Sequence, residues 1–83
     1  MAKGDTLARM RSNPWGDWTI ADVQAVCRRA GLVCLPPSGG PHWKVSHPAL
    51  RDVLTVPARR PIKPVYIRKL VQMADEAGGR DGG

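Results

Sequence analysis

Apolar residues recur at the spacing of an α-helix in two parts of the 83-residue chain. In the first part they share one helical face, whose members are Ile20, Val23, Cys27 and Ala30. Thr19 and Asp22 form the pattern of a capping box at its start, and Gly31 suits the residue that follows a helix. This pattern predicts a helix over residues 20–30.

The second apolar stripe has the same helical spacing and consists of Ile67, Leu70, Val71 and Ala74. Pro64 lies just before the stripe and suits the first turn of a helix, where the missing N–H of proline is not needed. Gly78 and Gly79 mark the end of the pattern. We therefore predict a second helix from Pro64 up to this glycine pair.

Between these helices, three apolar runs predict strands over residues 32–35, 42–47 and 52–56. The middle run alternates between apolar and polar residues, as a half-buried strand does. Trp43 and Val45 fall on one face, which we expect to join the core. His42, Lys44 and Ser46 fall on the opposite face, which stays open.

Residues 6–12 add a short N-terminal helix, ended by the Pro14–Gly16 turn. The predicted fold class is therefore α+β, with the order helix, three strands, helix behind that short helix. We expect an antiparallel three-stranded sheet with both main helices on one face. We divide the chain into an N-terminal extension (1–18), a main domain (19–78) and a flexible tail (79–83).

The charge of the chain indicates the class of its partner. Thirteen Lys and Arg residues against seven Asp and Glu give a net charge of +6 and a pI of about 10.2. Such a charge is typical of a nucleic-acid-binding domain. An acidic protein partner is equally compatible with it.

Other compositional features exclude several classes of protein. Cys27 and Cys34 are too few for a disulfide framework or a zinc site, and Cys27 is expected to be a buried free thiol. No apolar run approaches the ~20 residues of a membrane span. The first residues lack the apolar stretch of a signal peptide. We expect a cytoplasmic protein with no metal, cofactor or membrane partner.

The two histidines stand at opposite ends of the middle apolar run. His42 and His47 are five positions apart, so a regular strand places them on opposite faces, where they cannot share a metal. His42 follows a glycine turn and shares its face with Lys44. A histidine exchanges protons near neutral pH, so His42 is a candidate base for an RNA 2′-OH. The alternative is an exposed polar residue without a catalytic role.

Basic residues supply candidate phosphate contacts. Lys44 lies beside His42, and the remaining candidates follow the third strand: Arg59, Arg60, Lys63, Arg68 and Lys69. The start of the last helix is itself a favourable place for an anion. A solvated charged surface is the alternative, but the density of cations favours contact with phosphate.

Three ordered motifs resemble the HicA family, the toxins of HicA–HicB toxin–antitoxin systems. They are GPHWKVSHP at residues 40–48, LTVP at 54–57 and IKPVYIRKL at 62–70. The resemblance covers about residues 19 to 77. It implies a fold like that of the double-stranded-RNA-binding domain.

The resemblance also implies an activity, a partner and two site residues. A HicA toxin is an mRNA interferase, an endoribonuclease of the stress response that cleaves mRNA without a metal and is neutralised by a HicB antitoxin. The toxin is expected to be monomeric alone and hetero-oligomeric with the antitoxin. The catalytic histidine of the family corresponds to His42 and its glycine to Gly40, which lets the backbone approach RNA. Pro41 departs from the serine or threonine common in the family.

Two further hypotheses compete with a toxin. A non-catalytic RNA-binding module of the same fold would hold RNA without cleaving it. A basic protein-interaction domain would use the charged surface for an acidic protein instead.

Overall fold

The structure, a computed structural model, describes residues 5–79. Its elements are, in order, α1 (Asp5–Ser12), α2 (Ile20–Ala30), β1 (Val33–Leu35), β2 (His42–Ser46), β3 (Leu54–Pro57), α3 (Pro64–Ala74) and the π-helical turn η1 (Asp75–Gly79). The α+β class and the predicted order are confirmed. Apart from Gly79, the tail predicted at residues 79–83 lies outside the described residues.

Helix α2 begins and ends where its capping residues predict. The Thr19 hydroxyl accepts a hydrogen bond from the Asp22 backbone N–H at 3.4 Å, and the Asp22 carboxylate accepts one from the Thr19 N–H at 2.9 Å. Gly31 ends the helix in the left-handed conformation, at φ 79°. This closes the helix and turns the chain toward β1.

The first strand begins one residue later than predicted. The Leu32 N–H donates to the Cys27 carbonyl oxygen at 2.8 Å, so Leu32 completes the end of α2 and does not join the sheet. The third strand is also displaced toward the C-terminus and spans Leu54–Pro57 in place of 52–56. Pro57 is tolerated because β3 is an edge strand, where one N–H is not needed.

Helix α3 starts at Pro64 as predicted, but its regular part ends at Ala74. Helical structure continues as η1 up to Gly79, so the predicted end at the glycine pair is confirmed, although the last turn is π-helical and not α-helical. Two consecutive glycines lower the helical preference of this segment. The wider turn still leaves Ala77 packed against the core.

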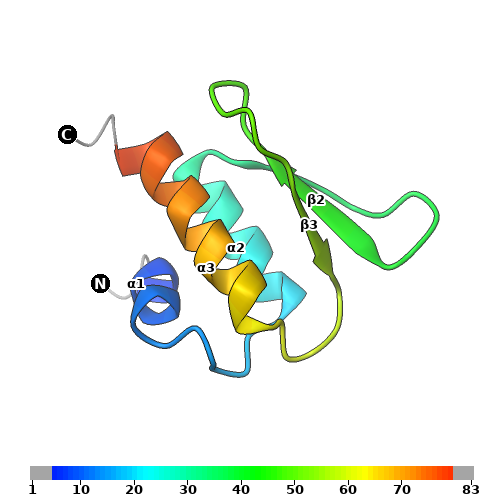
Figure 1. The fold of residues 1–83 in the computed structure, drawn as a ribbon, viewed down its shortest axis with the longest axis horizontal. Coiled ribbons are helices and arrows are strands. Elements are labelled where there is room, and N and C mark those ends of the chain that lie inside the picture. The colour runs from blue at the N-terminus through cyan, green and yellow to red at the C-terminus, as the bar shows by residue number, and fades with distance from the viewer. Residues whose placement is uncertain (1–4, 80–83) are drawn as a thin grey trace.

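The sheet is antiparallel with strand order β1-β2-β3, so β2 is bonded on both sides. Helices α2 and α3 lie side by side against one face of it, and α1 lies on the far side of that helical layer (Figure 1). The other face of the sheet is open. This confirms the expectation that both main helices share one face.

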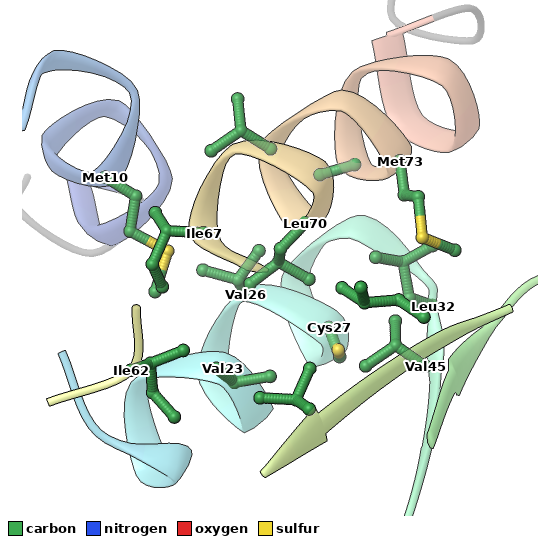
Figure 2. Close-up of a cluster of buried hydrophobic side chains, with 14 of the residues drawn as sticks. Met10, Val23, Val26, Cys27, Leu32, Val45, Ile62, Ile67, Leu70 and Met73 are labelled. Carbon is green, nitrogen blue, oxygen red and sulfur yellow. The ribbon is translucent and has the colours of Figure 1, made fainter. Parts of the chain in front are cut away.

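The core lies between the helical layer and the sheet. Figure 2 shows Val23 and Val26 of α2, Leu70 of α3 and Val45 of β2 within one cluster of buried side chains. Met10 reaches in from α1 and is 0% exposed. The N-terminal extension therefore contributes to the same core as the main domain.

The two predicted core residues of β2 differ in burial. Val45 is completely buried, whereas Trp43 is only half-buried and is outside the core cluster. The expectation that Trp43 joins the core is therefore wrong in part. An indole is large and is rarely covered completely, and a single layer of helices covers this end of the strand incompletely.

Candidate functional site

The open face of the sheet carries a groove beside the start of β2. Its volume is about 490 Å³, and it is formed by the end of β1, the glycine turn and β2: Leu35, Pro36, Pro37, Ser38, Gly39, Gly40, His42 and Lys44. Three of the predicted site residues, Gly40, His42 and Lys44, thus lie together. The rim at Gly40 is uncrowded, because a side chain there would meet no atom within 4 Å.

His42 is the first residue of β2 and is exposed on the open face. Its backbone is fixed by the pairing of His42 with Pro57 across the sheet. One residue earlier, the Pro41 carbonyl oxygen accepts a hydrogen bond from the Ala58 N–H at 3.0 Å. Proline suits position 41 because this ladder uses its carbonyl and not an N–H. The imidazole therefore projects into solvent from a firmly held strand end.

The charge of the groove suits an anion. Lys44 is exposed two residues along the same face from His42, and its Cα partners are Leu35 on β1 and Thr55 on β3. None of the eight described residues that line the groove is acidic. A phosphate in the groove would therefore meet a cation and an imidazole without a competing carboxylate.

Arg59 and Lys63 follow the end of β3 in the sequence. Together with Pro57 and Tyr66 they line a hollow of about 120 Å³. Pro57, the last residue of β3, is the cross-strand partner of His42. Arg59 follows Pro57 by two residues. Arg59 and Lys63 therefore lie in a separate hollow, linked to the groove through the pairing of His42 with Pro57.

Arg60 is engaged elsewhere, with Asp17 of the N-terminal extension. Its Nε donates to the two carboxylate oxygens at 3.0 and 3.1 Å, and its Nη2 donates at 2.7 Å. This hydrogen bonding lowers the pKa of the Asp17 carboxyl below its usual value. Sequence reasoning missed this pairing, because its two residues are 43 positions apart.

The two predicted contacts on α3 also have partners of their own. The guanidinium of Arg68 lies 4.8 Å from the centre of the Trp15 ring, a cation–π contact with the N-terminal extension. The Lys69 ammonium donates to the Asp52 carboxylate at 3.0 Å. The structure therefore does not bring Arg68 or Lys69 into the groove.

Sequence reasoning missed the groove wall made by Leu35 and the residues that follow it. Leu35 is 51% exposed although it belongs to the apolar run of β1. The signal that could have revealed it is the alternation of side chains along a strand. Because Cys34 points inward, its neighbours Val33 and Leu35 point outward. Ser38, a hydroxyl-bearing residue, lines the same groove.

His47 lies outside the groove, one residue past the end of β2. It is half-buried, and its Nδ1 accepts a hydrogen bond from the Ala49 N–H at 3.0 Å. This hydrogen bond gives His47 a structural role in the turn that follows β2.

Within residues 5–79, no three His, Cys, Asp or Glu side chains are grouped closely enough to hold a metal ion. No helix in that range has both the length and the apolar character needed to cross a membrane.

Comparison with protein-family models, with curated proteins and with solved structures finds no match to this chain. The similarity to HicA toxins thus stays a prediction that depends on the three sequence motifs. The groove has to be interpreted from its own residues.

Proposed function

We propose that this protein is a metal-independent endoribonuclease of the cytoplasm that cleaves mRNA, with His42 as its proton-transfer group. The observation that carries the proposal is the position of His42. Its side chain is exposed in a groove that also contains Lys44, and none of the described residues lining this groove is acidic. The resemblance of residues 40–48 to the HicA motif supports the same residue. A fold like that of the double-stranded-RNA-binding domain is part of the proposal.

The chemistry uses the nucleophile that RNA itself carries. His42 takes the proton of a 2′-OH, and the 2′-oxygen forms a bond to the adjacent phosphorus. The bond from phosphorus to the 5′-oxygen breaks, and that oxygen takes a proton from His42 or from water. Lys44 stabilises the charge that develops on the phosphate oxygens. The products are a 2′,3′-cyclic phosphate and a 5′-hydroxyl.

A toxin role follows from this activity, because cleavage of mRNA stops translation. The proposed antagonist is a HicB-type antitoxin that binds this chain in a hetero-oligomer and covers the groove. A neighbouring reading frame for such a protein would support this part of the proposal. The toxin alone is proposed to be monomeric.

The test is cleavage of a single-stranded RNA by the purified chain in excess EDTA. We expect cleavage that falls at least about a hundredfold in His42→Ala, the loss typical of a missing proton-transfer group. His47→Ala is the matched control, because it removes the other imidazole, five residues away and outside the groove. A DNA strand of the same sequence should resist cleavage, because it has no 2′-OH.

The same experiment separates the competing functions. Cleavage by His42→Ala at the rate of the unchanged protein would contradict the assignment of His42. Retention of RNA without any cleavage would favour a non-catalytic RNA-binding module. Tight binding of an acidic protein without measurable affinity for RNA would favour a protein-interaction domain.

A further inference from the structure

An aliphatic side chain is exposed in the wall of the groove. Leu35 is 51% exposed and lines the same hollow as His42 and Lys44. It is the Cα partner of Lys44 across the β1–β2 ladder, and both point to the open face. An exposed leucine beside a cation gives the groove two chemically different halves.

The apolar half of the groove extends beyond Leu35. Pro36 and Pro37 follow it directly and also line the hollow. The two proline rings restrict the backbone of this wall, so little conformational freedom is lost when a ligand covers it. The apolar half is therefore a preformed surface and not a flexible loop.

A nucleotide has the same two halves, because it joins an anionic phosphate to a flat base with an apolar face. We propose that Leu35 and Pro37 form a seat for one unstacked base of an RNA strand, next to the phosphate held by Lys44. This inference rests on the proposed function and specifies its substrate as single-stranded. A base inside a duplex is stacked on its neighbours and does not offer its face to such a seat.

Charge complementarity selects RNA as the occupant over an apolar protein segment. Among the described residues that line the groove, Lys44 carries a positive charge and none carries a carboxylate. The whole chain carries a net charge of +6. An anionic strand gains from this charge at every position, whereas an apolar peptide gains only at Leu35 and the prolines.

Binding has to be measured apart from cleavage, so the experiment uses the His42→Ala background. A fluorescently labelled single-stranded RNA is titrated with this protein, with and without Leu35→Ser. Covering the exposed part of a leucine contributes about five- to tenfold to affinity, so Leu35→Ser should weaken binding by that factor. A hairpin duplex RNA should bind equally well to both proteins.

Val33→Ser is the matched control, because Val33 is on the same strand and face and is 40% exposed but lies outside the groove. It should leave RNA affinity within about twofold, as expected for a surface change away from the ligand. Leu35→Phe should keep or increase affinity, since an aromatic ring stacks on a base. This variant guards against a loss of binding that only reflects a damaged fold.

A second experiment identifies which base of the RNA binds at the seat. RNAs that each lack one base are compared on both proteins, and one abasic position should weaken binding to the parent but not to Leu35→Ser. Equal affinities of the Leu35→Ser and Val33→Ser proteins would overturn the base seat. So would a protein ligand that loses affinity with Leu35→Ser while single-stranded RNA does not.

The two proposals can fail separately. His42-dependent cleavage with no effect of Leu35→Ser on RNA binding would remove the base seat and keep the nuclease. Leu35-dependent RNA binding by a protein that cleaves nothing would keep the base seat in an RNA-binding module.

Discussion

The Asp17 carboxylate accepts hydrogen bonds from both Nε and Nη2 of Arg60, so a residue of the N-terminal extension binds a cation of the loop before α3. The same loop is held by its backbone, since the Ile62 N–H donates to the Trp18 carbonyl oxygen at 2.8 Å. Both side chains of the ion pair are well exposed. Solvent and a phosphate can therefore compete for Arg60.

Removing the carboxylate should release Arg60 for phosphate. We expect Asp17→Asn to bind single-stranded RNA about two- to threefold more tightly at low salt. The slope of log K against log salt should become steeper by at most the amount that one phosphate contact contributes. Stability should change little, because exposed ion pairs contribute little. Binding isotherms at several salt concentrations check this, and an affinity that is unchanged or lower would contradict it. Asp52→Asn, which releases Lys69, is the matched control.

Lys44 is expected to bind phosphate in the groove. Lys44→Gln should reduce RNA affinity and decrease the slope of log K against log salt by about 0.7, the value for one contact to a single strand. Arg29→Gln removes an equal charge from the exposed end of α2 and should leave the slope almost unchanged. Equal slopes for the two variants would show that Lys44 acts only through net charge.

Met10 should be important for stability although it lies in the N-terminal extension. It is 0% exposed, and Figure 2 shows it pointing from α1 toward Ile67 of α3. Met10→Ala should lower the free energy of unfolding by about 2–4 kcal/mol, whereas Met10→Leu should cost less than about 1.5 kcal/mol. Urea unfolding measures both values. A Met10→Ala loss below that of Met10→Leu would contradict the packing.

Gly31 offers a substitution whose cost arises from the backbone alone. Its φ is 79°, and a side chain there would meet no atom within 4 Å. Gly31→Ala should therefore lower the free energy of unfolding by about 1 kcal/mol, the cost of the left-handed conformation for a residue with a Cβ. Gly31→Asn should lose less, because asparagine tolerates that conformation. Thermal unfolding of the two variants shows which of them is less stable.

The Cys27 thiol should be unreactive in the folded protein. Burial raises its pKa to about 12, and the neighbouring Cys34 adds to the effect. The nucleophilic thiolate is then scarce at pH 8, so iodoacetamide should modify Cys34 first and Cys27 only after unfolding. In the unfolded chain this thiol loses its proton near its ordinary pKa of 9.0, so the stability of the fold should fall as the pH rises from there toward 12. Rapid labelling of Cys27 at pH 8 under native conditions would disprove this.

The sequence predicted those elements whose signals are local. Thr19, Asp22 and Gly31 set the ends of α2 by hydrogen bonds and dihedral angles within the segment itself. Period-two alternation likewise placed His42 and Lys44 on one face of β2. Such features depend on neighbours a few residues away and are therefore visible without the fold.

The partners of the basic residues depend instead on contacts across the fold. Arg60 meets Asp17, and Lys69 meets Asp52, because loops and helices that are distant in sequence come together. No spacing rule links such residues, so a count of cations between Arg59 and Lys69 overestimated the number available in the groove. The exposure of Leu35 was missed for a related reason, since a three-residue apolar strand gives too short a pattern to show which side is covered.

The groove is built from two kinds of backbone, the central strand β2 and the connection that precedes it. His42 and Lys44 stand on a strand that is bonded on both sides, whereas Pro36 to Gly40 form a connection outside the sheet. In the proposed site, His42 and Lys44 are thus anchored to the central strand, whereas Pro37 of the base seat belongs to a peripheral turn. We expect substitutions in that turn to change the nucleotide preference of the proposed site at little cost in foldability.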